Sequence, residues 1–146
     1  MSDGQKPKNF LPFLTVQIVL VLIVFLAVVY LFPGEWNLRR WVGLLLMSMG
    51  AVGLFTARFQ LGNSFAVTAQ ARELVTRGVY SKIRNPIYVF SSLLILGVFI
   101  IMGKAYLFLP FAGLVVVQTW RAHKEAKVLE AKFGEQYRAY RRQTWF

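Results

Sequence analysis

A polar, basic stretch interrupts an otherwise apolar chain at residues 74–88, which read LVTRGVYSKIRNPIY. Asn85 and Pro86 predict the start of a helix, because proline fits the first helical turn and asparagine can cap it. The unpaired N–H groups of a helix start favour an anion, and Arg84 stands beside them. Gly78 favours a turn just upstream. These residues could bind a carboxylate or a phosphate, although Asn-Pro also fits an ordinary helix start.

A second polar segment contains Arg121 and Glu125, which are spaced one helical turn apart. The simplest interpretation is a surface ion pair worth roughly a few tenths of a kcal/mol. A carboxylate where an apolar run ends is more costly than one in water, which favours a specific partner such as an arginine or a pair of hydroxyls. Tyr88 lies in the first turn of the helix that starts at Pro86, and it fits an interfacial aromatic residue equally well.

Composition limits the class of protein to which these residues belong. The chain has 146 residues, of which 57% are hydrophobic, and it has a formal net charge of +11 and no cysteine. That length suits one domain. A soluble domain of this size cannot bury so much apolar surface, so lipid is the expected solvent. The lack of cysteine excludes disulfides and thiol catalysis, and with His123 as the single histidine no metal site is expected.

Four apolar segments have about the length needed to cross a bilayer, which takes about 20 helical residues. They cover residues 10–32, 41–59, 87–103 and 105–120. We therefore expect an all-α, polytopic membrane protein with a single domain over residues 1–146 and about four transmembrane helices. The first segment is too long for a signal peptide and has no small-residue cleavage site after it, so it is expected to remain as an anchor.

Only Lys104 separates the third and fourth segments, so these two helices are expected to form a tight antiparallel hairpin. Pro110 predicts a kink in the fourth helix. Gly53 and Ala57 form a small-xxx-small pair, which is weak evidence for a helix contact. Beyond the fourth segment, apolar residues recur at helical spacing and predict an amphipathic tail that ends or bends at Gly134. A basic helix of this kind could also simply lie on anionic lipid.

Basic residues are divided unequally between the two sides of a four-span topology. Of the 17 lysines and arginines, all except Arg39, Arg40 and Lys104 fall on the side that holds both termini. By the positive-inside rule, both termini are cytoplasmic, in an inner, plasma or endoplasmic-reticulum-type membrane. The cytoplasmic segments 60–86 and 121–146 flank the same hairpin, so chain geometry allows them to meet.

Together the two polar segments resemble the isoprenylcysteine carboxyl methyltransferase family and its phospholipid methyltransferase relatives, which are integral membrane enzymes that use S-adenosylmethionine. The family pattern is Leu-Val-Thr-x-Gly-x-Tyr, then Arg-His-Pro-x-Tyr, a helical hairpin, and a tail that begins Arg-x-x-x-Glu-Glu. Here the matching stretches read LVTRGVY at 74–80, RNPIY at 84–88 and RAHKEAKVLEAKFGEQYRAY at 121–140. The resemblance depends on this ordered set of motifs, because no single motif is specific.

The resemblance implies a cytoplasmic pocket for S-adenosyl-L-methionine between the hairpin and a folded-back tail. Arg84 and the helix start would hold the carboxylate of the cofactor, and Glu125 would accept bonds from its ribose hydroxyls or ammonium. Arg121 and Glu125 would be the catalytic residues, with Arg121 orienting an acidic substrate. The residues assigned to the cofactor are Leu74, Gly78, Tyr80, Arg84, Asn85, Pro86, Tyr88 and Glu125.

Two positions depart from the family pattern, since the family's histidine is Asn85 here and its second glutamate is Ala126. Asparagine can replace one hydrogen bond of a histidine, but it cannot take up a proton at neutral pH. The leading expectation is methyl transfer to a lipophilic, lipid-like or isoprenoid-bearing acceptor. The departures leave open a degenerate member that acts as a membrane scaffold or lipid-binding protein. Nucleic-acid binding is not expected, because the positive-inside rule accounts for the charge, and the oligomeric state stays open.

Overall fold

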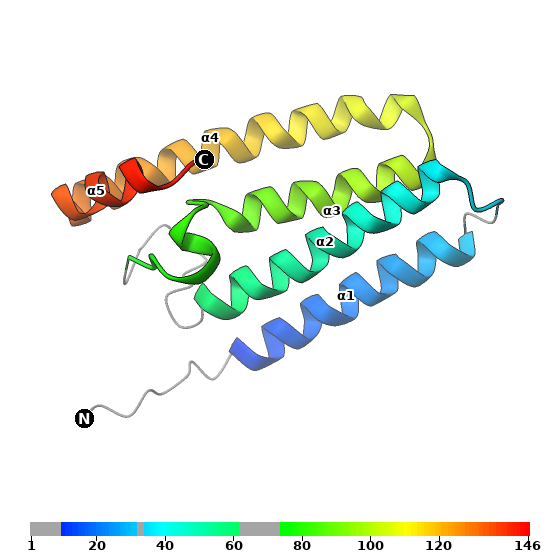
Figure 1. Ribbon diagram of the computed structural model, residues 1–146, viewed down its shortest axis with the longest axis horizontal. Helices are drawn as coiled ribbons and strands as arrows, with labels where there is room; N and C mark the ends of the chain where they lie inside the picture. The colour runs from blue at the N-terminus through cyan, green and yellow to red at the C-terminus, as the bar shows by residue number, and fades with distance from the viewer. Residues whose placement is uncertain (1–9, 32–33, 62–73) are drawn as a thin grey trace.

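The computed structural model describes residues 10–31, 34–61 and 74–146, and in these residues the chain is helical, with a single isolated bridge between Ile83 and Trp145. The all-α prediction is therefore confirmed. Four long helices run antiparallel to their neighbours, and a short fifth one folds back along the fourth (Figure 1). The helices are α1 (Phe10–Leu31), α2 (Leu38–Leu61), α3 (Pro86–Met102), α4 (Phe108–Phe133) and α5 (Glu135–Gln143), with short 3-10 turns η2 (Gly78–Ser81) and η3 (Ala105–Leu107).

The helix bounds agree with the four apolar segments except at two places. Arg39 and Arg40 lie inside the first turn of α2, and α4 continues without a break from the fourth apolar segment into the tail. The prediction that Pro110 kinks the fourth helix is wrong. Pro110 lies in the first turn of α4, where its missing N–H interrupts no helical hydrogen bond. Part of the 60–86 connection, residues 62–73, lies outside the described residues.

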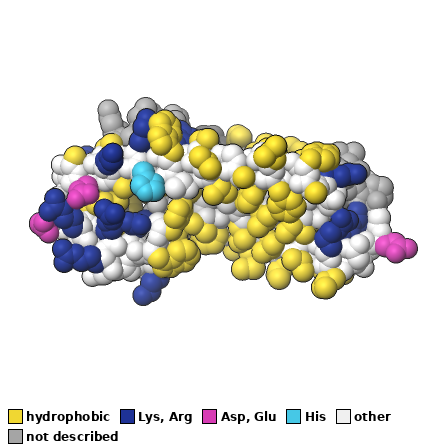
Figure 2. All heavy atoms as spheres, turned by 90° about the horizontal axis from the view of Figure 1, so that it is seen from above, with side chains coloured by type: hydrophobic (Ala, Val, Ile, Leu, Met, Phe, Trp, Pro, Cys, Tyr) yellow, Lys and Arg dark blue, Asp and Glu magenta, His cyan; other side chains and the backbone are white. Residues whose placement is uncertain are grey.

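Two described stretches, Leu38–Leu61 and Ala105–Phe133, are long and apolar enough to cross a membrane, and Ile18–Val28 and α3 are shorter apolar helices. The crossing by four helices stays a prediction. Seen from the α4 side, hydrophobic side chains fill the middle of the molecule and lysines and arginines gather at both ends (Figure 2). This distribution is typical of a protein whose middle faces lipid.

Glycines allow α2 and α3 to pack with their backbones close together. A Cβ atom on Gly97 would lie 2.6 Å from the Gly43 carbonyl oxygen and 2.8 Å from Met47 Cα, and one on Gly50 would lie 2.7 Å from Leu94 Cα. The buried positions of α2 recur at spacings of three and four along the helix, which is the spacing of a helix–helix interface. Gly53 and Ala57 are both buried, and a Cβ atom on Gly53 would meet the Phe90 ring of α3, so the predicted helix contact is confirmed at Gly53.

The fourth helix packs much less closely. Of the 26 residues of α4, only Ala122 is buried, and a Cβ atom on Gly113 would meet nothing within 4 Å. An edge-on contact between Phe99 and Phe111, with ring centroids 6.3 Å apart, joins α3 and α4 near their connecting turn. The predicted antiparallel hairpin is confirmed (Figure 1), but its two helices are held by few contacts.

The tail reverses direction at Gly134, as its sequence predicts. Gly134 has a φ of 51°, which favours glycine, and α5 begins directly after it. Arg138 on α5 bonds back to Glu130 at 2.9 Å and to Glu135 at 2.7 Å. Tyr140 is buried, and its hydroxyl donates a 2.7 Å hydrogen bond to the carbonyl oxygen of Tyr80. The reversal thus places α5 against the segment that precedes α3.

We predict that Gly97→Ala destabilises the protein by about 1–3 kcal/mol, because the added methyl group would push the backbones of α2 and α3 apart. Gly113→Ala is the matched control, and because its Cβ meets open space it should be neutral or more stable by up to about 1 kcal/mol. Thermal unfolding in detergent measures both. Equal melting temperatures for the two variants would contradict the close packing.

We also predict that the docked tail loosens at alkaline pH. Burial, together with the neighbouring Tyr137, raises the pKa of Tyr140 to about 12. A phenol whose pKa is raised on folding contributes stability that is complete below about pH 10 and lost as the pH rises through about 12. The melting temperature should therefore fall over this interval in the native protein and in the exposed-site control Tyr30→Phe.

In Tyr140→Phe the protein should be less stable at pH 8 by about 1 kcal/mol, because the Tyr80 carbonyl loses its partner. The melting temperature of this variant should also fall less with rising pH than that of the native protein. An alkaline fall of the same size in Tyr140→Phe would show that other groups cause it.

Candidate functional site

The turn before α3 is fixed to the end of α2 by Gln60. Gly78 has a φ of 60°, so the predicted turn is confirmed, and η2 begins at this residue. The Gln60 Oε1 atom accepts a 2.7 Å hydrogen bond from the backbone N–H of Val79, and its side chain occupies the space that a side chain at position 78 would need. Leu74 is half-buried in the irregular stretch just upstream.

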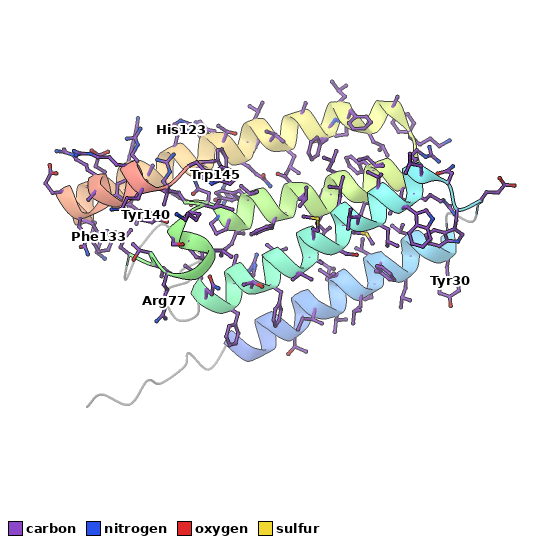
Figure 3. The ribbon with its side chains drawn as sticks, in the orientation of Figure 1. Tyr30, Arg77, His123, Phe133, Tyr140 and Trp145 are labelled. Atoms are coloured by element: carbon purple, nitrogen blue, oxygen red, sulfur yellow. The ribbon has the colours of Figure 1, made fainter. Side chains whose placement is uncertain are left out.

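The end of the tail lies directly against the start of α3. The Trp145 N–H donates to the Lys82 carbonyl at 3.0 Å, and the Phe146 carbonyl accepts from Arg84 N at 2.9 Å and from Asn85 N at 3.1 Å. The two polar segments therefore meet, as chain geometry allowed (Figure 3). The tail backbone thus satisfies the N–H groups of Arg84 and Asn85, which lie just before α3. Anion binding at the start of the helix stays a prediction.

Asn85 occupies the N-cap position of α3 and Pro86 begins the helix, as predicted. The Asn85 side chain, however, makes no capping hydrogen bond, which corrects the expectation that it caps the helix. Its backbone carbonyl instead accepts from the N–H groups of Tyr88 and Val89. The half-buried amide of Asn85 is thus left for another partner, while Pro86 is fully buried.

Glu125 on α4 is bound by Tyr88 on α3, whose hydroxyl donates to Glu125 Oε1. The simple interpretation of an ion pair with Arg121 is wrong, since the described residues contain no such pair and Arg121 is exposed on α4. Tyr88 is more than an interfacial aromatic residue, because it links the first turn of α3 to the carboxylate. This bond joins the start of α3 to the part of α4 that leads into the tail.

Two polar atoms near this link are buried without a hydrogen-bond partner among the described residues, the Tyr80 hydroxyl and Arg84 Nε. Tyr80 is only 6% exposed, and burial raises the pKa of its phenol well above the ordinary value, with a further rise from Tyr140. Burial likewise raises the pKa of Tyr137, and the positive charge of Arg84 offsets only part of this rise. An unpaired buried polar group costs about 1–3 kcal/mol, so these atoms favour a polar ligand.

Two further features lie away from these residues. A hollow lined by Val28, Trp36, Arg40, Leu44 and Ile101 is at the opposite end of the bundle, so it is not the predicted cofactor pocket. His123 is exposed on the outer side of α4, where its Nδ1 atom lies 2.7 Å from the carbonyl oxygen of Thr119 (Figure 3). It stands apart from Tyr88 and Glu125.

Sequence reasoning missed several residues that build this region. The Gln60 side chain and the backbones of Trp145 and Phe146 bond to backbone groups of other segments, and no pattern of side chains in the sequence predicts such bonds. Gln118 left a signal, because it lies seven residues before Glu125 and therefore on the same face of α4. It bonds to Ser92 on α3 at 2.6 Å.

The sequence matches a family model described as phospholipid methyltransferase over residues 38–136. This match runs from the start of α2 into α5 and includes both Tyr88 and Glu125. No curated protein matches the chain. The family implies methyltransferase activity at a membrane on lipid-like substrates, with S-adenosylmethionine as the usual methyl donor. With more than half of its residues matched, and with the motif order that the resemblance required, this chain belongs to the phospholipid methyltransferase family.

Proposed function

We propose that this protein transfers a methyl group from S-adenosyl-L-methionine to a lipophilic acceptor at the cytoplasmic face of a membrane. The observation that carries the proposal is the hydrogen bond from Tyr88 to Glu125, which are 37 positions apart in the sequence. It joins the two segments that the family resemblance assigns to one site, RNPIY at 84–88 and the tail from residue 121. Family membership supplies the reaction type.

The membrane topology is part of the proposal, with α1 to α4 spanning the bilayer and both termini cytoplasmic. The apolar middle of the molecule and its charged ends support this placement (Figure 2). Aromatic residues lie where the interfaces would be, since Trp36 and Trp41 contact each other at one end of the bundle. Lys124 Nζ lies 3.7 Å from the Trp120 ring centroid at the other.

The residues present fit the cofactor that the family implies. Arg84, whose Nε atom is unpaired within the described segments, would hold the carboxylate of the cofactor. The Glu125 carboxylate would accept from the ribose hydroxyls or the ammonium group. The Asn85 amide, which makes no capping hydrogen bond, would donate to or accept from the cofactor. The rings of Tyr80 and Tyr88 would contact adenine or the sulfonium, because an aromatic face attracts a cation. Leu74, Gly78 and Pro86 would shape the backbone around them.

When bound, S-adenosylmethionine supplies an electrophilic methyl group carried on a positively charged sulfur. The protein would contribute mainly by positioning the acceptor and by excluding water. Glu125 is the group in the site able to take a proton from an amine acceptor, whereas an ionised acid needs no base. Arg121, one turn before Glu125 on α4, would orient an acidic acceptor by its charge.

We predict that Glu125→Gln weakens binding of S-adenosylmethionine by about tenfold or more, because hydrogen bonds to a charged group are worth about 1.5–3 kcal/mol. Calorimetric titration of the detergent-purified protein measures the affinity. Glu135→Gln is the matched control, since Glu135 is exposed on α5 and pairs with the exposed Arg138. If neither the cofactor nor its demethylated product binds at millimolar concentration, the protein is instead the degenerate scaffold or lipid-binding member that the departures at Asn85 and Ala126 allow.

Tyr88→Phe keeps the aromatic ring and removes the donor to Glu125. We expect methyl transfer from labelled cofactor to a membrane lipid extract to fall about tenfold, because the carboxylate loses the bond that orients it. Tyr106→Phe is the control, since Tyr106 is 70% exposed at the far end of the bundle. Full activity in Tyr88→Phe would remove this bond from the mechanism.

A further inference from the structure

A second group of polar side chains joins α3 and α4 beyond the Tyr88–Glu125 bond. Ser92 Oγ donates to Gln118 Oε1 at 2.6 Å, and Gln118 Nε2 donates to Ser91 Oγ at 3.2 Å. Ser91 Oγ in turn donates to the Tyr88 carbonyl at 3.1 Å. We call Ser91, Ser92 and Gln118 the Ser–Gln cluster. It lies within segments otherwise composed of apolar residues, where polar side chains are costly unless they have a specific role.

The cluster has a defined place in the row of contacts between the two helices. Phe111, Gln118 and Glu125 are spaced seven residues apart, so they fall on one face of α4 and meet Phe99, the serines and Tyr88 of α3 in turn. Ser92 is four residues beyond Tyr88, which places the cluster about 6 Å deeper along the helix axis. It therefore lies between the candidate methyl-transfer site and an aromatic contact.

Lipid can reach this cluster from the side. Ser91, Ser92 and Gln118 are half-buried, whereas Val115, Val116 and Val117, just before Gln118 on α4, are 38%, 67% and 53% exposed. The Gly113 position also has open space beside it. The loose packing of α4 contrasts with the glycine interface of α2 and α3, so the cluster is not the polar element of a tightly packed helix pair.

The hydrogen-bonding capacity of the cluster is neutral and incompletely used. Gln118 donates one N–H to Ser91 and accepts at one lone pair from Ser92. Its second N–H and the lone pairs of Ser92 Oγ are therefore available for further hydrogen bonds. No charged side chain belongs to the cluster. The ligand that fits this cluster is therefore an uncharged group that accepts a hydrogen bond and carries an apolar chain.

We propose that the Ser–Gln cluster binds the uncharged ester linkage between the head group and the chains of the acceptor lipid. Naming that lipid an acceptor rests on the proposed function. With the linkage at Gln118, the head group extends toward Tyr88 and Glu125 and the chains leave between α3 and α4 into the bilayer. The cluster would thus set the depth at which an acceptor lies.

The test compares two lipids that differ only in this linkage. Dioleoyl phosphatidylethanolamine, whose amine can accept a methyl group, is competed against its diether analogue for the detergent-purified protein, and native mass spectrometry counts the bound lipids. The native protein should prefer the ester by about fivefold, as expected for one neutral hydrogen bond. Gln118→Leu and the smaller change Ser92→Ala should both reduce this preference to parity.

Thr119→Val is the matched control, because Thr119 adjoins Gln118 but its hydroxyl donates to the Val115 carbonyl of its own helix. It should keep the ester preference. Equal binding of the two lipids by the native protein, or an unchanged preference in Gln118→Leu and Ser92→Ala, would overturn the proposal. If the preference follows the cluster while no labelled methyl group reaches either lipid, the lipid subsite stands and the proposed enzymatic function fails.

Discussion

The close approach of α2 and α3 is the contact on which the other features depend. With glycine at positions 43, 50 and 97, the two backbones are separated by less space than any side chain would require. Dispersion and shape complementarity, rather than the hydrophobic effect, hold such an interface in lipid. Because α3 is fixed on this face, its opposite face presents Tyr88 and the Ser–Gln cluster to α4 in a constant position.

The contacts of α4 differ in kind from those of α2. Its buried surface is small, and its links to α3 are a phenol–carboxylate bond, the Ser–Gln cluster and one aromatic pair. A helix held by a few directional bonds can open locally at lower cost than one held by continuous packing. The firm pair and the loosely attached helix would therefore suit the proposed enzyme, which would have to admit a lipid from the side and keep its polar groups in place.

The end of the bundle that holds the start of α3 is assembled from segments that are distant along the chain. The Gln60 side chain fixes η2, the Tyr140 hydroxyl reaches the Tyr80 carbonyl, and the Phe146 carbonyl accepts from two N–H groups before α3. Each of these bonds satisfies a backbone group that helix formation leaves unpaired. The Tyr80 hydroxyl and Arg84 Nε stay buried without a hydrogen-bond partner among the described residues, which supports the proposed cofactor site.

The sequence by itself determined the helices and some of their limits, because apolar runs, Pro86 at a helix start and Gly134 at a helix end act through local backbone chemistry. It also determined the family, because the order of the motifs can be recognised in the sequence without a structure. Only the tertiary structure decided that Tyr88, rather than Arg121, is the partner of Glu125, and that tail carbonyls occupy the N–H groups beside Asn85. Those outcomes depend on which surfaces meet after the chain has reversed at Gly134. A local pattern carries no information about such distant contacts, so residues such as Gln60 and Phe146 could not be read from their neighbours.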